Sequence, residues 1–477
     1  MAAGASGVGG IGPSPNTPRK SPMSSATTIQ PATTIQTPST TQRIRLRRGR
    51  GAPPVAAGCS STVWEDAGIP HRLYRRARGR SSVAERGVGC ALALLAASAA
   101  LLLAGAAAAQ SPGEPARTGV RIDFPRGPVI ASSRITGLAG AFTGVAEGID
   151  GALKNPASLA NRPEHATSWF DVDVAFDLLN TTGDAIDFDA DGVPGAAGAS
   201  FQAINIGLAL QLDGFAVGVL AAIDDWSGGK DATALDGNLV DLILGVAQAF
   251  GGGEVIVGAG LNVRAFTLTE QSGASLDLAS ETYDFGVLWR PAGYQWRVGA
   301  QLRLGGVLAP TGDPASNLSP GHEVRDAVAP WQLGLGVSHR WAADPERPYN
   351  APLRRATPAI DRRYLLLTAD VVISGAVPGA VNLEGFVGGA PRRAGVTPTA
   401  SLHLGAEGEV LHDRLRARVG TYLEPVRASN DGFGRLHITG GAELHLFELG
   451  PLDLKASFAF DMAAGFNNIL FGVGLWN

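Results

Sequence analysis

The most constraining feature of this sequence is a repeated alternation of apolar and polar residues. Between residues 331 and 341, Trp, Leu, Leu, Val, His and Trp occupy every second position, with Gln, Gly, Gly, Ser and Arg between them. Successive side chains of a β-strand point to opposite faces, so this period indicates strands with one apolar and one polar face. The pattern recurs from residue 165 to the C-terminus. The sequence therefore predicts an all-β fold.

About 14 such runs follow one another, and many are longer than ten residues, which suits tilted strands that cross a bilayer. The predicted strands are residues 165–176, 199–212, 215–226, 238–249, 254–269, 279–290, 294–308, 329–341, 362–374, 400–411, 414–425, 433–447, 451–461 and 466–477.

The lengths of the connections give an independent test. Most connections after even-numbered strands are tiny, such as Asp213-Gly214, and most connections after odd-numbered strands are longer. The stretch 342–361 is the exception. Short turns on one rim and long loops on the other are typical of outer-membrane barrels. Because lipid tolerates no open sheet edge, we expect residues 165–477 to close into a transmembrane antiparallel β-barrel.

Composition and charge narrow the functional classes. The chain has 477 residues, 64 Gly, 30 Pro and only 17% charged residues, which disfavours a coiled coil. Residues 1–109 hold 13 basic and 3 acidic residues, whereas the remainder has a net charge of −14. An acidic body does not favour nucleic acid as a partner. Both cysteines, Cys59 and Cys90, lie in the basic part, so the body has no disulfide or thiolate site.

The N-terminal part has the pattern of an export signal. Residues 1–87 are low in complexity and basic, which predicts a disordered extension or a start of translation assigned too early. Residues 88–109 form an uncharged apolar run that ends in three alanines before Gln110. A basic flank, an apolar core and small exit residues predict a signal peptide. A retained transmembrane anchor is the alternative, because the run is long enough to span a bilayer.

Residues 132–161 carry a family resemblance. They contain Gly137-Leu138-Ala139-Gly140-Ala141-Phe142 and, further on, Asn155-Pro156-Ala157. This stretch resembles the N-terminal plug segment of FadL-type hydrophobic-compound transporters and their PorV-like relatives. Small residues allow tight packing inside a barrel, and Pro156 biases Asn155 away from helical angles. The Asn155 side chain is also suited to holding a kinked turn by bonding nearby backbone.

The resemblance implies a barrel of 14 strands with a plug, which we assign to residues 110–164. For the plug motif we single out Gly137, Gly140, Asn155, Pro156 and Ala157, either as residues that shape the turn or as residues with a direct part in ligand passage. FadL-type proteins pass hydrophobic molecules, whereas PorV-like relatives serve protein secretion.

Polar side chains on the inner faces of the predicted strands are the other candidates. Such charges either pair with one another to fill the barrel, or contact the plug or a ligand carboxylate. These lumen candidates are Arg264, Arg297, Arg303, Glu443 and His445.

One loop resembles a cation site. Asp187, Asp189 and Asp191 alternate before Gly192, as in a calcium loop, but Gly198 stands where the last acidic ligand belongs. A solvated acidic loop is the alternative reading. No Ser/His/Asp set can be assembled, and no zinc-ligand or phosphate-loop spacing occurs, so we expect no enzyme and no cofactor.

The sequence thus predicts an outer-membrane barrel that passes small hydrophobic molecules passively past an N-terminal plug. Its expected partners are outer-membrane lipid and a hydrophobic ligand. The alternative is a PorV-like barrel that acts as partner or shuttle for secreted proteins.

Overall fold

The computed structural model describes residues 119–124, 127–162, 169–182, 186–195, 198–229, 234–311, 318–342, 349–350, 363–411, 414–427, 434–449 and 452–476. The predicted basic extension and the predicted signal peptide lie outside these residues. Among the helices in these ranges, none is both long and apolar enough to cross a membrane.

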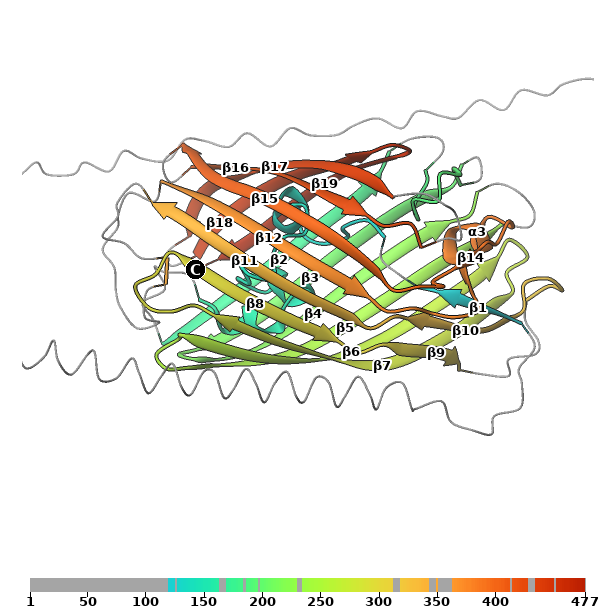
Figure 1. Ribbon diagram of the computed structural model, residues 1–477, viewed down its shortest axis with the longest axis horizontal. Coiled ribbons are helices and arrows are strands. Elements are labelled where there is room, and N and C mark those ends of the chain that lie inside the picture. Colours follow the sequence, from blue (N-terminus) through green and yellow to red (C-terminus); the bar gives the residue numbers. More distant parts are fainter. Residues whose placement is uncertain are drawn as a thin grey trace, which may run out of the picture. The chain divides into compact units, whose positions relative to one another are not determined.

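Fourteen long antiparallel strands form a closed barrel (Figure 1). The last strand pairs with the first, with Gly474 opposite Ala175, and this pairing closes the sheet. The predicted all-β barrel of about 14 strands is therefore confirmed. The barrel strands are β2 (Phe170–Thr181), β3 (Ser200–Leu212), β4 (Phe215–Ser227), β5 (Leu235–Phe250), β6 (Val255–Glu270), β7 (Ser275–Trp289), β8 (Trp296–Arg303), β11 (Gln332–Ala342), β12 (Tyr364–Ser374), β15 (Thr399–Leu411), β16 (Leu415–Glu424), β17 (Arg435–Leu449), β18 (Leu452–Ala463) and β19 (Phe466–Trp476).

The outward face of the barrel is apolar. On β3, Ile206, Leu208 and Leu210 are exposed, whereas Gly207 and Ala209 between them are buried. The same alternation continues around the wall, with Leu335 and other large apolar side chains pointing outward. A closed barrel with such a surface is a membrane-spanning barrel of the bacterial outer-membrane type. The predicted localisation in the outer membrane is confirmed.

The two rims differ as the connection lengths predict. One rim carries tight turns such as Asp213-Gly214, where Asp213 has a φ of 53°. The long loops gather at the opposite rim, which we call the loop rim. The exceptional connection on the short-turn rim includes Tyr349 and Asn350, which are buried against β8. Arg297 donates hydrogen bonds to the Tyr349 carbonyl and to the Asn350 side-chain oxygen.

Five short strands form a cap sheet at the loop rim. Its order is β9, β10, β1, β13, β14, and the N-terminal strand β1 is central because it pairs in parallel with β10 and β13. A short helix, α3 (Leu383–Val387), follows β13. The cap strands are β1 (Val120–Asp123), β9 (Gly306–Pro310), β10 (Val324–Ala329), β13 (Ala380–Asn382) and β14 (Arg393–Ala394).

Two predicted strands were placed wrongly. The predicted strand 294–308 ends at Arg303, and Leu308, expected on the outward face, is fully buried in β9. Apolar and polar residues do alternate in this stretch, but β9 pairs with β10 of the cap sheet. The local sequence pattern does not show with which strand a segment pairs. The predicted strand 165–176 instead runs from Phe170 to Thr181, with Leu178 still pointing outward.

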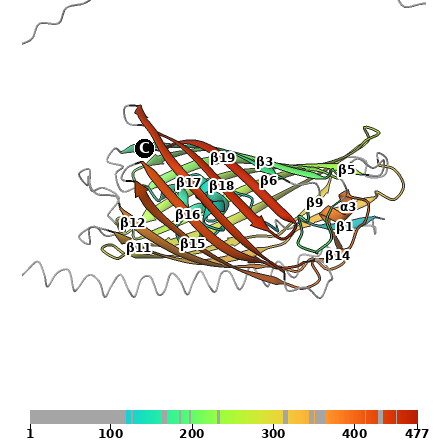
Figure 2. The same cartoon turned by 90° about the horizontal axis from the view of Figure 1, so that it is seen from above.

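After β1 the chain enters the barrel. Residues 129–162, which we call the inner segment, lie within the ring of strands in both views (Figures 1 and 2). The segment has one turn of α-helix and two of 3-10 helix: α2 (Ser133–Gly137), η1 (Asp150–Leu153) and η2 (Pro156–Ala160). Ser132 caps α2 by accepting a hydrogen bond from the Ile135 amide. Many small and apolar residues of the inner segment are fully buried, and with residues of the wall they form one hydrophobic core of the barrel.

Candidate functional site

Glycines line the barrel wall where the inner segment touches it. A Cβ atom built on any of them would lie 2.7 Å or less from an inner-segment atom, so a larger residue would force the wall or the segment to shift. Several face one another across neighbouring strands, such as Gly218 and Gly245 or Gly299 and Gly336. This glycine girdle consists of Gly207, Gly218, Gly245, Gly258, Gly286, Gly299, Gly336, Gly405 and Gly420.

The Asn155-Pro156-Ala157 turn is seated in this girdle. The Asn155 Oδ1 accepts a hydrogen bond from the Ala157 amide at 3.1 Å, which caps η2. Its Nδ2 donates to the carbonyl of Thr143 within the segment and to the carbonyl of Val287 on the wall, both at 3.1 Å. Asn155 is fully buried. One amide thus shapes the turn and attaches it to β7.

The two glycines predicted for the plug motif lie at the start of the inner segment. Gly137 ends α2 against Arg418 on β16, where an added Cβ would lie 3.2 Å from the arginine Cβ. Gly140 has a φ of +78°, a conformation that other residues adopt at a cost. Gly140 is therefore favoured by its backbone conformation, whereas an added Cβ at Gly137 would make a tight contact with the Arg418 side chain.

Wall carboxylates hold the backbone of the inner segment. Asp370 on β12 accepts hydrogen bonds from the Phe142 and Thr143 amides at 2.8 and 2.7 Å. On β2, Asp173 accepts from the Ile149 amide at 2.6 Å, and Asp177 accepts from the Ser133 amide at 2.8 Å. None of these aspartates is among the site residues predicted from the sequence. Their signal is an acidic residue at an inward-facing position of a membrane strand.

A buried ion-pair network joins the inner segment to the wall. Arg134 contacts Glu407 on β15 at 2.9 Å and Glu147, within the segment itself, at 2.9 Å. Glu407 also contacts Arg418 at 2.6 Å, and Arg418 reaches Glu443 at 2.9 Å. Because a buried charge without its partner is energetically unfavourable, these ion pairs favour one fixed position of the inner segment against the wall.

The predicted lumen residues all lie on the inner face of the wall. Arg297 donates to Glu147 at 2.6 Å and lies 3.5 Å from the centre of the Tyr349 ring. Arg303 forms a two-pronged pair with Asp284, at 2.8 and 3.0 Å.

The remaining predicted lumen residues pair with wall residues. Arg264 pairs with Asp241 at 3.2 Å. Glu443 belongs to the network described above, and His445 lies 3.3 Å from its carboxylate. Arg297 thus contacts the inner segment through a charge, whereas Arg303 reaches it only by donating to the Leu153 carbonyl at 3.3 Å.

A second cluster of buried polar side chains contacts Val129, at the start of the inner segment. His437 lies between two carboxylates, with Nδ1 2.7 Å from Asp461 and Nε2 2.8 Å from Glu424. The Tyr422 ring stacks on the His437 ring at 4.1 Å, and its hydroxyl donates to Asp461 and accepts from the Val129 amide. Sequence pattern places these residues inward but does not pair them.

Above the girdle, on the side of the loop rim, the inner wall becomes polar. Among the described residues, several buried side-chain amides and hydroxyls there have no hydrogen-bond partner. Buried polar groups of this kind are normally satisfied by water. This polar belt comprises Asn205, Asn262, Ser280, Thr282 and Asn468.

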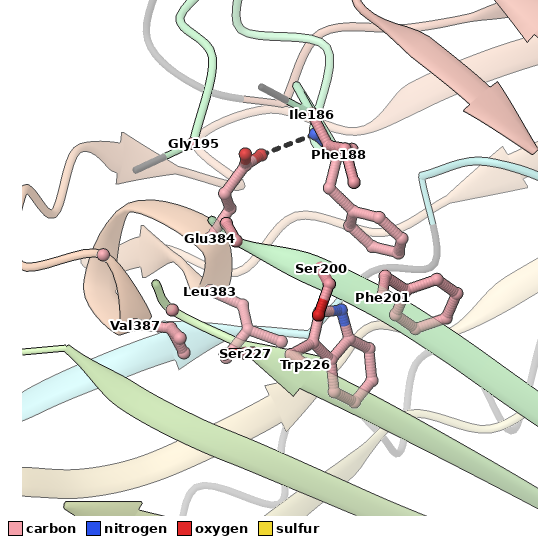
Figure 3. Close-up of a pocket in the computed structure, with 13 residues that line it drawn as sticks. Ile186, Phe188, Gly195, Ser200, Phe201, Trp226, Ser227, Leu383, Glu384 and Val387 are labelled. Atoms are coloured by element: carbon pink, nitrogen blue, oxygen red, sulfur yellow. Dashed lines mark hydrogen bonds between the residues drawn. The ribbon is translucent and has the colours of Figure 1, made fainter. Parts of the chain in front are cut away.

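Nearest the loop rim the lumen is aromatic and aliphatic. Phe201, Trp226 and Phe266 occupy the inward positions above the belt, and Phe124 packs on two of these rings at 4.8 and 5.7 Å. A small hollow of about 30 Å³, partly open to solvent, lies beside this cluster (Figure 3). We call it the rim pocket. It is lined by Ile186, Phe188, Gly195, Ala199, Ser200, Phe201, Trp226, Ser227, Gly228, Leu383, Glu384, Val387 and Gly388.

The predicted acidic loop borders this pocket. One carboxylate oxygen from each of Asp187, Asp189 and Asp191 lies within 4.8 Å of the others. Each also has protein donors: Gly192 and Asp191 amides on Asp187, Asn382 on Asp189, and Arg392 on Asp191. The structure brings the three side chains together, and a calcium site at this loop stays a prediction.

No protein-family profile matches the chain, and no curated protein matches it. Among solved structures it is similar to a FadL homologue of Pseudomonas aeruginosa, at 14% identity over 75% of this chain and 99% of the other, with a TM-score of 0.45. It is also similar to the Pseudomonas putida toluene transporter TodX, at 12% identity over 75% and 99%, with a TM-score of 0.44. For the Ralstonia pickettii toluene transporter TbuX, identity is 11% over 74% and 98%, with a TM-score of 0.43. The strand pairing of the described residues itself establishes the closed barrel of 14 strands.

Proposed function

We propose that this barrel passes small hydrophobic molecules across the outer membrane, with the inner segment as a plug that must shift to let them through. The observation that carries the proposal is the seat of the inner segment in the glycine girdle. At nine wall positions an added Cβ atom would lie 2.7 Å or less from the segment, so the seated segment closes the lumen along these strands.

The aromatic cluster and the polar belt lie between the plug and the loop rim. Their order supports entry of a hydrophobic solute at the loop rim. The aromatic cluster gives an apolar molecule a favourable place to leave water. The polar belt below it is an unfavourable environment for the same molecule. A solute that has entered the aromatic cluster therefore stays there until the plug moves and opens another path.

The plug is attached to the wall by noncovalent contacts, which must break when it moves. It is held by hydrogen bonds and ion pairs to wall side chains, such as Asp370 and Glu407, and is continuous with strand β1 of the cap sheet. A displacement of the plug would pull on the centre of the cap, so cap and plug are expected to open together. We assign no energy source, and transport follows the concentration gradient.

The rim pocket favours a small molecule over the secreted-protein alternative. It is concave and lined by rings and aliphatic side chains, as small-molecule sites are, rather than a broad flat face. A PorV-like role in secretion instead requires that exported proteins co-purify with the barrel. Purification from the outer membrane checks this directly.

Uptake into cells tests the proposal. The full chain is expressed in a bacterium that lacks its own hydrophobe channel, and entry of radiolabelled toluene is followed over seconds. We expect faster entry than in cells with an empty vector, and unchanged entry of a labelled disaccharide. Equal toluene entry with and without the barrel, at matched expression, would reject transport.

A further inference from the structure

His437 on β17 is fully buried between two carboxylates that come from the neighbouring strands. Its Nδ1 lies 2.7 Å from an Asp461 oxygen on β18, and its Nε2 lies 2.8 Å from Glu424 Oε2 on β16. A neutral imidazole carries one proton, so one of its nitrogens would turn a lone pair towards a carboxylate oxygen. Only a ring that carries both protons, an imidazolium, donates to both partners.

Arg435 is the other cation at this site. Its Nε lies 2.6 Å from Glu424 Oε2 and 3.1 Å from His437 Nε2, and the shorter contact assigns the Arg435 proton to the glutamate. The same guanidinium donates to the carbonyls of Asp187 and Phe188 in the β2–β3 loop and lies 3.7 Å from the Asp187 carboxylate. Because Arg435 is held by these groups, His437 Nε2 is left to donate to Glu424.

The two carboxylates both depend on the histidine charge. Among the described residues, His437 is the only ion-pair partner of Asp461, whose other oxygen accepts from the Tyr422 hydroxyl at 2.6 Å. Glu424 also pairs with Arg435, but its Oε1 is buried and has no hydrogen-bond partner in the part of the chain that the structure describes. Loss of one ring proton would leave buried negative charge without compensation, which is unfavourable.

Tyr422 connects this site to the inner segment. Its ring stacks on the His437 ring, with the centres 4.1 Å apart, and its hydroxyl accepts a hydrogen bond from the Val129 amide at 3.1 Å. The strand register places His403 on the other side of Tyr422, where the two rings also stack. His403 contacts the Ala139 carbonyl and, among the described side chains, no carboxylate. A shift of the Tyr422 ring would therefore release the inner segment at its first residue.

We propose that the second proton of His437 is a pH-dependent latch on the inner segment. While the ring is an imidazolium, both carboxylates are compensated and Tyr422 holds the Val129 amide. When a rise in pH transfers one ring proton to hydroxide, the contact between that nitrogen and its carboxylate becomes repulsive, the stacked rings shift, and the segment loosens at Val129. The latch concerns the position of the segment, and only its consequence for solute passage rests on the proposed function.

The test compares the protonation of the ring with the exposure of the segment. The full chain, with Cys59 and Cys90 changed to serine, is placed in lipid nanodiscs with ¹⁵N-labelled histidine and titrated from neutral to alkaline pH. The His437 nitrogens report one or two protons, and His437→Gln identifies their signals by disappearance. Maleimide labelling of Val129→Cys, buried at the latch, reports exposure. Ala292→Cys, exposed in the turn after β7, corrects for the higher reactivity of thiols at high pH.

The corrected labelling rate should rise as the ring loses its second proton, with the same midpoint. We expect a rise of about tenfold to a hundredfold, which corresponds to one charged hydrogen bond. His437→Gln keeps an amide donor but no charge, so labelling should be fast at every pH. Asp461→Asn removes one of the negative charges that favour the imidazolium, so the step should move to lower pH. His403→Gln, beside the same tyrosine, is the matched control and should keep the midpoint of the parent.

The outcomes separate the latch from the proposed function. A His437 ring with one proton at neutral pH, or labelling that does not follow its titration, would overturn the latch. A step that persists in His437→Gln would assign it to another group, such as Glu384. Should His437→Gln fail to fold, the shift in Asp461→Asn against the His403→Gln control still decides the question. A step at the His437 midpoint without toluene uptake would support the latch and reject transport, and uptake without a step would reject the latch alone.

Discussion

Gly258 on β6 lies directly against the peptide bond between Pro156 and Ala157, so that a Cβ atom at residue 258 would overlap the Pro156 carbonyl. Two residues further along the same strand, Gly260 also points inward, but a Cβ there would meet its nearest neighbour at 3.6 Å, an ordinary contact. The two glycines therefore form a matched pair, one in tight contact with the inner segment and one not.

Gly258→Ala should displace the plug, whereas Gly260→Ala should not. Overpacking of a tight contact costs about 1–3 kcal/mol. We expect Gly258→Ala to raise toluene uptake and to lower the denaturant concentration at which the barrel unfolds. Gly260→Ala should match the unmodified chain in both measurements. Equal behaviour of the two variants would show that the girdle does not seat the plug.

Removal of the Arg134 charge should loosen the plug. Arg134→Met leaves Glu407 and Glu147 without one of their partners in a buried setting, and breaking such a pair costs about 3–5 kcal/mol. A cysteine at Ser158, fully buried on the plug, reports the loosening through its rate of maleimide labelling. We expect the rate to rise roughly a hundredfold or more.

The control for this experiment is a pair in the cap. Arg121 contacts Asp326 at 2.7 Å but its side chain is 26% exposed, so Arg121→Met should cost less than about 1 kcal/mol. Labelling of the reporter should then stay near the rate of the parent. If Arg121→Met raised the labelling rate as much as Arg134→Met, the effect would come from the loss of any arginine charge and not from this buried ion pair.

Asn155 supports the plug through both ends of its amide. Asn155→Asp keeps the oxygen that caps η2 but loses the donations to Thr143 and Val287, while Asn155→Ala loses all three bonds. Each lost neutral bond costs roughly 1 kcal/mol, and the buried aspartate would also face two carbonyl oxygens, so both variants should speed labelling of the Ser158→Cys reporter, the aspartate variant more. An aspartate variant as slow as the parent would show that the amide donors are dispensable.

The cap should weaken as pH rises. The pKa of Glu384 is raised from 4.5 to about 9, chiefly by burial. Between these values the folded cap holds a proton that the unfolded chain releases, so stability is fully present near pH 4.5 and is lost as pH rises towards 9. Trypsin cutting at Arg393 of β14, relative to Glu384→Gln, should therefore accelerate from pH 7 to pH 9. A constant ratio would contradict the raised pKa.

Most of the barrel was predictable because a strand that faces lipid on one side and the barrel interior on the other carries that alternation in its own sequence. The predicted strand 215–226 lies within one residue of β4, since its outward face must be apolar and its turn residue Asp213 adopts a positive φ. The cap was not predictable. Leu308 continues an alternating pattern but turns inward, because β9 pairs with β10 of the cap sheet and not only with the wall.

The site was predictable only in its local parts. The turn at Asn155 follows from Asn and Pro in sequence, and the inward position of Arg297 follows from its strand. Its partner Glu147 lies 150 residues away, and no sequence pattern joins them. The girdle leaves a signal, an inward glycine on strand after strand, but its meaning appears only once the segment lies against it.

Uptake through a disulfide-locked barrel tests gating by the plug most directly. The Ser133 and Ser457 hydroxyl oxygens, on plug and wall, lie 2.5 Å apart, which suits a cysteine pair. Gln332 and Ser374 lie on neighbouring wall strands at 3.3 Å and provide a control pair that does not touch the plug. Toluene uptake should fall to background when the plug pair is oxidised, recover on reduction, and be unaffected by the control pair. Full uptake through the oxidised plug pair would contradict gating by the plug.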